Sequence, residues 1–242
     1  ALIISIVIII AAGIAVIIFV RKPVEIVVPV EIKDQGPVTA VMGNSVEGRK
    51  IESFTYGTGS NHVVFVGGIH GGYEWNSVLL AYQMMDYLKE NIDAIPENVK
   101  VTIVPSANPD ALFKVVNKEG RFTAEDASTD KTLLASARFN ANKVDLNRNF
   151  ACKWQPQATW QNKSVSAGTA AFSEPEAMAI KKFAEEQKPQ AFVFWHSQAN
   201  AVYASECEKG ILPETLILMD TYAQASGYNP VKSFDSYVVT GD

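Results

Sequence analysis

The stretch His62-Val-Val-Phe-Val-Gly-Gly-Ile69, followed at once by His70-Gly71-Gly72-Tyr73-Glu74, indicates the fold of this chain. Its nearly continuous β-branched and aromatic residues are typical of a strand that is buried on both faces of a sheet. Residues Trp75 to Lys89 follow with apolar side chains at helical spacing. A buried strand that leads directly into a helix is typical of the α/β class.

The same alternation continues on both sides of this unit. Further strands are predicted at Val38–Met42, Arg49–Tyr56, Val99–Val104 and Ala191–Trp195, and helices at Ala111–Val116, Ser173–Gln187 and Glu214–Ser226. Ser173 is expected to cap its helix, with Pro175 at an early helical position. Residues 106–170 are otherwise predicted to be a long polar loop region, which usually carries function. The sequence therefore predicts an α/β fold, a three-layer αβα domain with a mixed, largely parallel central sheet.

Composition and charge exclude several classes of protein. Hydrophobic residues make up 48% of the 242 residues and charged residues 19%, which excludes a disordered or fibrous chain. Lys and Arg total 21 against 26 Asp and Glu, and no basic cluster occurs. We therefore expect no nucleic-acid partner.

Residues 1–20 carry no charge, and only Ser5 and Gly13 interrupt their apolar run. As a helix this segment would rise about 30 Å, enough to cross a bilayer, and no small-x-small cleavage site follows it. We expect one N-terminal transmembrane helix, with an uncleaved signal as the related alternative. Residues 21–36 are expected to be an extended spacer, and residues 37–242 the folded domain. Arg21-Lys22 alone would favour a cytoplasmic domain. The chain is expected to be a fragment at both ends, because it begins with Ala1 and stops without a helix end or tail.

Two of the three histidines stand where open α/β sheets bind ligands. His70 and His196 each follow the carboxyl end of a buried strand, whereas His62 begins a strand and is expected to be structural or on the surface. Imidazole and carboxylate groups are common zinc ligands, and catalytic zinc usually has three protein ligands. Glu74, four residues after His70, is the candidate third ligand. A His with an acid four positions later also occurs by chance, so the residues alone leave a structural alternative open.

Five motifs occur in an order that matches a known family. They are Gly67–Glu74, Asn108-Pro109-Asp110, Val144-Asp-Leu-Asn-Arg-Asn-Phe150, Phe172-Ser-Glu-Pro-Glu176 and Trp195-His196-Ser197. Together they resemble the zinc carboxypeptidases of the carboxypeptidase A type, the M14 peptidases, over residues Pro37 to Asp242. The resemblance implies a carboxypeptidase-like fold and one Zn²⁺ per chain.

The resemblance also implies roles for individual residues. The residues that it implies as metal ligands are His70, Glu74 and His196. Asn147 and Arg148 would hold the free carboxylate of a peptide C-terminus, for which a guanidinium fork is well suited. The residues that it implies around the scissile bond are Arg138 for the carbonyl and oxyanion, Tyr237 as a mobile group that closes over the substrate, and Ser197 for contacts in the S1 region.

Two features depart from the family pattern. His70 and Glu74 are four positions apart instead of three, but the additional residue lies beside Gly71 and Gly72, where the loop can absorb it. Glu74 is still the preferred ligand, bidentate or slightly displaced, because the next acid, Asp86, is far along the helix. The general-base glutamate of the family is expected beyond Asp242, together with most residues of the specificity pocket.

Cys152 and Cys207 are the only cysteines. Their even number beside an export-type segment favours a disulfide, with two unrelated buried thiols as the alternative. The resemblance places each cysteine a short way after a motif of the active site. A disulfide between Cys152 and Cys207 would therefore join two active-site loops. It would also favour an extracytoplasmic domain, against the orientation that Arg21-Lys22 suggests.

The expected function is therefore that of a membrane-anchored zinc metallocarboxypeptidase acting on the C-terminal peptide bond of peptides or proteins. An alternative substrate within the family is the stem peptide of peptidoglycan. An alternative of another class is a non-catalytic zinc-binding or peptide-binding homologue that lacks the general base. The protein would be secreted if residues 1–20 are cleaved.

Overall fold

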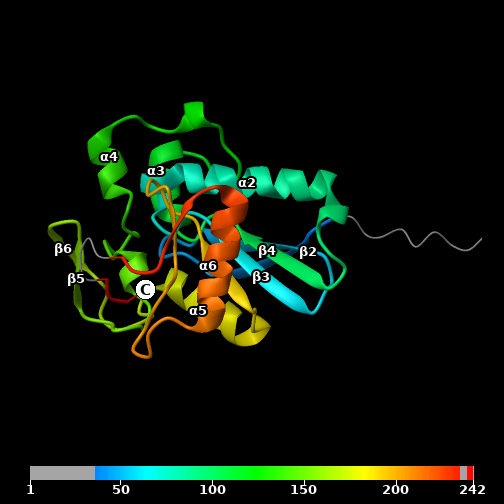
Figure 1. The fold of residues 1–242 in the computed structure, drawn as a ribbon. Coiled ribbons are helices and arrows are strands. Elements are labelled where there is room, and N and C mark those ends of the chain that lie inside the picture. Colours follow the sequence, from blue (N-terminus) through cyan, green and yellow to red (C-terminus); the bar gives the residue numbers. More distant parts are fainter. Residues whose placement is uncertain (1–35, 235–238, 242) are drawn as a thin grey trace, which may run out of the picture. The chain divides into compact units, whose positions relative to one another are not determined.

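A five-stranded mixed sheet lies at the centre of the computed structural model, which describes residues 36–234 and 239–241 (Figure 1). The strands, in spatial order, are β1 (Val38–Asn44), β2 (Lys50–Tyr56), β4 (Val99–Val104), β3 (Asn61–Val66) and β7 (Ala191–Phe194). β3 is parallel to both β4 and β7, whereas β2 is antiparallel to both β1 and β4. The prediction of a mixed sheet is confirmed, but "largely parallel" describes only β4, β3 and β7, because both pairings of β2 are antiparallel.

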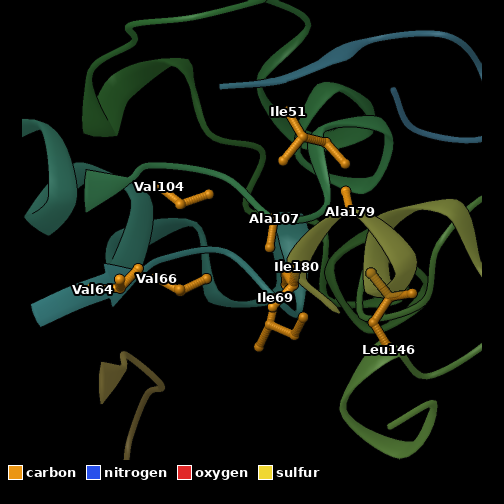
Figure 2. Close-up of a cluster of buried hydrophobic side chains, with 9 residues drawn as sticks. All are labelled: Ile51, Val64, Val66, Ile69, Val104, Ala107, Leu146, Ala179 and Ile180. Carbon is orange, nitrogen blue, oxygen red and sulfur yellow. The ribbon is translucent and has the colours of Figure 1, made fainter. Parts of the chain in front are cut away.

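Two helices cover opposite faces of the sheet and make the predicted three layers. Helix α2 (Trp75–Glu90) lies above the sheet in Figure 1 and helix α5 (Pro175–Gln187) lies below it. Side chains alternate between the two faces along each strand. Val64 and Val66 of β3 pack in the cluster that includes Ile180 of α5, shown in Figure 2. Phe65, between them, packs on the α2 side.

The remaining elements surround this centre. The helical ones are η1 (Gly71–Glu74), η2 (Ile92–Ala94), α3 (Pro109–Val116), η3 (Ala124–Asp126), α4 (Lys131–Ser136), η4 (Leu146–Arg148) and α6 (Pro213–Ser226). The additional strands are β5 (Gln157–Trp160), β6 (Lys163–Ser166), β8 (Ala201–Tyr203) and β9 (Asn229–Val231). The hairpin β5–β6 and helix α4 lie in the region predicted as loop. The two strands have four residues each and helix α4 has six, which is too short for a hydrophobic period to indicate them.

One local prediction is wrong at the start of α5. Glu174, not Ser173, occupies the position before the first helical turn. Ser173 Oγ donates to the Glu174 carboxylate at 2.8 Å instead of capping a backbone N–H of the helix. Pro175 does stand at the beginning of the helix, as predicted.

The expected transmembrane segment, residues 1–20, lies outside the described residues, as does almost all of the expected spacer 21–36. Within residues 36–234 and 239–241, none of the helices has the length and apolarity needed to span a bilayer.

Candidate metal centre and substrate site

The strand order places two histidines at one edge of the sheet. β3 and β7 are parallel neighbours, so their carboxyl ends meet. His70 follows β3 and precedes η1, and His196 follows β7 by two residues. The two imidazole rings lie with their centroids 4.9 Å apart. His62, at the opposite end of β3, is buried and its Nε2 lies 2.7 Å from Thr102 Oγ1, so the structural alternative holds for it.

Glu74 lies between these two histidines. Its Oε1 is 2.9 Å from His70 Nδ1, and its Oε2 is 3.0 Å from His196 Nδ1. One ligand atom from each of the three residues lies within 4.8 Å of the others. The structure thus brings together the three predicted metal ligands, and η1 absorbs the longer spacing between His70 and Glu74.

The turn that carries Glu74 is held closely against helix α3. A Cβ at Gly72 would lie 2.6 Å from the backbone oxygen of Ala111 and would overlap the side chain of Val115. Ser77 Oγ closes the turn from the other side, because it accepts from Gly68 N at 3.0 Å and donates to Glu74 O at 2.7 Å. Only a residue without a side chain allows this approach, so the glycines determine where the carboxylate lies.

The electrostatics of the cluster favour an ionised Glu74. Burial works against the charge, but hydrogen bonds with His196 and His70 lower the pKa of Glu74 to about 2. The pKa of His70 is raised, because its contacts with Asp145 and Glu74 outweigh burial, which lowers it. Glu74 is therefore an ionised carboxylate with an imidazole on each side, a donor set that a divalent cation would complete.

Asp145 is a further residue of the site, and its role was not predicted from the sequence. It is fully buried, and its Oδ1 lies 3.4 Å from His70 Nε2 and accepts from Asn147 N at 3.1 Å. His70, Arg138 and Arg148 together hold the pKa of Asp145 well below its usual range, although burial raises it. Its position in the Val144–Phe150 motif is the one sequence feature that points to a role in the site. The spacing of residues along the chain does not show which side chains Asp145 contacts.

Arg138 lies beside the metal cluster, as its predicted role requires. It is 3% exposed, its Nε donates to Asp145 Oδ2 at 2.9 Å, and its Nη1 lies 3.3 Å from His70 Nδ1. The ion pair holds one side of the guanidinium, while Nη1 faces the side of His70 that contacts Glu74. A donor at that place suits a developing oxyanion.

The two residues expected to hold a substrate carboxylate are adjacent on η4. Arg148 is buried, its Nη1 donates to Asn147 O at 2.7 Å, and its Nε donates to Thr159 O at 3.4 Å. Asn147 is half-buried. Gly241 lies against this segment, donating to Cys152 O at 2.6 Å and accepting from Phe150 N at 2.5 Å. Asn147 and Arg148 thus lie side by side on η4, and their role in binding a substrate carboxylate stays a prediction.

Ser197 and Tyr237 complete the predicted set. Ser197 Oγ donates to Asn76 Oδ1 at 2.8 Å, which ties the segment after His196 to the first turn of α2. Tyr237 lies outside the described residues, so its predicted closing movement stays a prediction.

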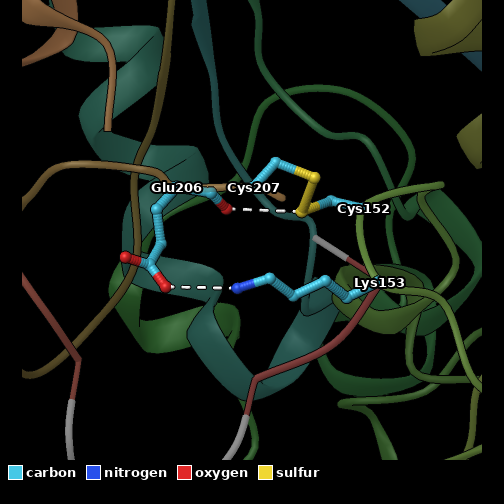
Figure 3. The surroundings of a disulfide bond; sticks show 4 residues. All are labelled: Cys152, Lys153, Glu206 and Cys207. Atoms are coloured by element: carbon cyan, nitrogen blue, oxygen red, sulfur yellow. Dashed lines mark hydrogen bonds and ion pairs between the residues drawn. A yellow bond between two sulfur atoms is a disulfide. The ribbon is translucent and has the colours of Figure 1, made fainter. Parts of the chain in front are cut away.

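A disulfide joins Cys152 to Cys207, as predicted, with a Cα–Cα distance of 5.6 Å (Figure 3). Lys153 Nζ and Glu206 Oε1 form an ion pair at 3.3 Å beside it. The bridge links the segment after Arg148 to the loop after β8. The alternative of two unrelated thiols is therefore wrong.

The donor set fits zinc. Two histidines and one glutamate are a common ligand set of catalytic zinc sites. His70 Nε2 is buried and lies toward the Asp145 carboxylate. Metal-binding histidines usually have this arrangement, in which one ring nitrogen binds the ion and the other contacts a carboxylate. With the proton on Nε2, the lone pair of Nδ1 would face Glu74 and the ion.

Comparison with known proteins agrees with this geometry. The family model for zinc carboxypeptidases matches residues 34–232 of the chain. The chain is 24% identical over 219 residues to γ-D-glutamyl-L-diamino acid endopeptidase 1 of Lysinibacillus sphaericus, a match that covers 81% of this chain. The chain spans only 54% of that relative's length.

Solved structures share the fold. Murein-tripeptide amidase MpaA from Escherichia coli O157 is 20% identical, with a TM-score of 0.58, and the match covers 85% of this chain and 76% of the amidase. Bovine thrombin-activatable fibrinolysis inhibitor, solved with a tick carboxypeptidase inhibitor, is 18% identical, with a TM-score of 0.63 and coverage of 85% and 73%.

Proposed function

The chain belongs to the zinc carboxypeptidase family, and from this premise we propose that it is the catalytic part of a zinc-dependent metallocarboxypeptidase that hydrolyses the C-terminal peptide bond of peptides or proteins. The observation that carries the proposal is the convergence of His70, Glu74 and His196 around one small volume, with Arg138 beside it. The order of the five motifs and the length of the family match support the same conclusion.

The proposed roles follow from the side chains. His70, Glu74 and His196 would hold Zn²⁺, which when bound supplies a Lewis acid that polarises a peptide carbonyl. Arg138 would donate Nη1 to the oxygen that becomes negative. Its buried pair with Asp145 fixes the guanidinium before substrate arrives, so little reorganisation is needed during the reaction.

The exopeptidase geometry is assigned to the η4 segment. Arg148 and Asn147 would bind the free carboxylate of the substrate, so that the last peptide bond lies over the metal centre. Ser197 would contact the residue before that bond, and Tyr237 would close over the substrate. The general base is proposed to be a glutamate outside residues 1–242.

Cell-wall peptide is the second candidate substrate. The relative from Lysinibacillus sphaericus is named for cleavage at a γ-D-glutamyl-L-diamino acid bond, and a structure with the same fold is a murein-tripeptide amidase. Those names favour a bond to diaminopimelate or a similar diamino acid in a peptidoglycan stem peptide. A third candidate, a zinc-binding or peptide-binding protein without catalysis, requires that the complete protein lack the glutamate base.

We also propose that residues 1–20 anchor the protein in a membrane with the catalytic domain outside the cytoplasm. The Cys152–Cys207 disulfide supports this orientation, because such bonds persist in oxidising compartments. Extraction of membranes at high pH tests the anchor. Protection of the domain from added protease in intact cells would contradict the orientation.

The decisive experiment uses full-length protein. Zinc per chain is measured by atomic emission, and hydrolysis is measured on ordinary peptides and on purified muropeptides in parallel. His196→Ala and Glu74→Ala should lose most of the zinc and the activity, whereas Glu185→Ala, an exposed acid of α5, is the control. Wild-type activity in either ligand variant would remove the zinc mechanism, and activity on muropeptides alone would select the second candidate. Zinc binding without hydrolysis of either substrate would select the third.

A further inference from the structure

Trp160, the last residue of β5, packs on the Arg138 guanidinium. The centre of its ring lies 4.5 Å from Arg138 Cζ. Both Trp160 and Arg138 come from the region between α3 and α5 that the sequence indicated only as loop. A cation over an aromatic face is attracted by the ring quadrupole, and the attraction is stronger where water is excluded. Because Arg138 is 3% exposed, this contact belongs to the stronger class.

Tyr73 connects the same ring to the metal centre. It lies between His70 and Glu74 in η1, and its ring meets Trp160 edge-to-face, with centroids 5.3 Å apart and an interplanar angle of 85°. The backbone N–H of Tyr73 also donates to Ala137 O, next to Arg138, at 3.2 Å. The turn that carries the candidate ligands and the segment that carries the arginine thus share one aromatic contact.

The hairpin β5–β6 also contacts the other charged groups of the site. The backbone oxygen of Ser166 accepts from Asp145 N at 3.0 Å, and that of Thr159 accepts from Arg148 Nε at 3.4 Å. Cross-strand pairing from Gln157–Ser166 to Trp160–Lys163 holds the two strands in register. One small hairpin therefore contacts Arg138 through the Trp160 ring, Arg148 through Thr159 O, and the backbone N–H of Asp145.

Two kinds of contact then restrict Arg138. Asp145 holds its Nε and Nη2 edge, each at 2.9 Å, which fixes the direction of the guanidinium in its plane. An ion pair alone leaves the plane able to tilt about that edge. The Trp160 ring covers one face and opposes this tilt. Nη1 is then directed toward the His70–Glu74 contact.

We propose that Trp160 is a positioning residue: its ring orients the Arg138 guanidinium toward the reacting carbonyl, and Trp160 itself does not touch the substrate. The inference rests on the proposed function for its catalytic consequence, but the restriction of Arg138 is a property of the folded chain and can be measured without substrate. Trp154 offers a matched comparison, since it packs in the same cluster while its indole N–H donates to Ala167 O at 3.1 Å.

The first experiment measures kinetics of zinc-loaded full-length protein. Trp160→Ala should lower kcat about 10- to 100-fold with KM changed less than about threefold, because misplacing a catalytic donor by about 1 Å has an effect of this size. Trp160→Phe, which keeps an aromatic face, should recover most of the loss. Trp154→Ala makes the same substitution in the same cluster and should leave kcat within about threefold of wild type. Equal losses in Trp160→Ala and Trp154→Ala would show a purely structural role and overturn the proposal.

The second experiment does not depend on activity. The Arg138 Nε–H signal is assigned in ¹⁵N NMR spectra by its loss in Arg138→Lys, and its exchange with water is measured. Exchange should be at least about tenfold faster in Trp160→Ala than in wild type and unchanged in Trp154→Ala. An unchanged signal in Trp160→Ala would overturn the inference even in an active enzyme. If wild type hydrolyses nothing while this pattern holds, the proposed function fails and the positioning of Arg138 stands.

Discussion

Arg138 and His70 meet at the same buried carboxylate. Asp145 Oδ2 accepts from Arg138 Nε at 2.9 Å, and Asp145 Oδ1 lies 3.4 Å from His70 Nε2. One side chain therefore orients both a candidate metal ligand and the arginine expected to face the substrate carbonyl. Removing its charge should affect metal binding and catalysis together.

Asp145→Asn tests this arrangement, because it keeps the shape and removes the charge. Zinc affinity should fall about 10- to 100-fold, the usual effect of losing a partner of a ligating histidine. Unfolding free energy should fall by about 3–5 kcal/mol, since Arg138 would remain buried without its partner. Chelator competition and urea unfolding measure the two effects.

Asp86→Asn is the matched control for that variant. Asp86 pairs with Arg121 at 2.8 Å on the surface, with both side chains more than half exposed. Loss of such a pair should change stability by less than about 1 kcal/mol. Similar small effects in both variants would show that the buried carboxylate has no special role.

Gly72→Ala should disturb the metal centre from outside it. The added Cβ would meet the Ala111 backbone oxygen at 2.6 Å, so η1 and α3 must separate. Overpacking of this kind destabilises by about 1–3 kcal/mol, and Glu74 should move with η1, lowering zinc content. Gly36→Ala, where a Cβ meets nothing within 4 Å, is the control. A wild-type zinc content in Gly72→Ala would contradict the idea that the turn sets the position of Glu74.

Glu176 should give the protein a measurable pH dependence. Its side chain is fully buried, and burial raises its pKa above the ordinary 4.5, although a hydrogen bond from Asn140 acts in the opposite direction. The native state then holds its proton more tightly than the unfolded state. Its contribution to stability is complete below pH 4.5 and is lost as pH rises through the native pKa.

Replacement of Glu176 by Gln should therefore flatten the stability profile above pH 4.5, with the variant gaining on wild type as pH rises. Urea unfolding at a series of pH values measures the difference. Glu185→Gln, an exposed carboxylate of the same helix, is the control. A variant that loses stability relative to wild type toward neutral pH would contradict the predicted sign.

The disulfide should contribute chiefly to stability. It closes a loop across a separation of 55 residues, which corresponds to about 4 kcal/mol in the chain-entropy account. A Cys152→Ser/Cys207→Ser variant should unfold at correspondingly lower urea concentration, and wild type treated with reductant should match it. Lys153→Ala, which removes only the exposed ion pair beside the bridge (Figure 3), should change little. Equal stability with and without the bridge would contradict this account.

Much of the fold could be predicted because long apolar stretches with a clear period each indicate one type of secondary structure. The β-branched stretch of β3 indicates a buried strand, and the spacing of apolar residues in α2 indicates a helix. His70 and His196 each follow a buried strand, which indicates that they lie at the same edge of the sheet. The antiparallel half of the sheet could not be predicted, because strand direction depends on the connections and not on the residues of β2. The hairpin β5–β6 is short and polar, so its pairing depends on contacts with distant segments.

The α/β class, the family motifs and the residue types available for chemistry could be predicted from the amino-acid sequence alone, because they follow from local periodicity and from the order of the motifs. The contacts of Asp145 with both His70 and Arg138, and the packing of Trp160 on the guanidinium, are visible only in the folded chain. The physical reason is that these relations join residues from separate loops. Their distances depend on how sheet, helices and hairpin pack together, and no spacing along the chain records that packing.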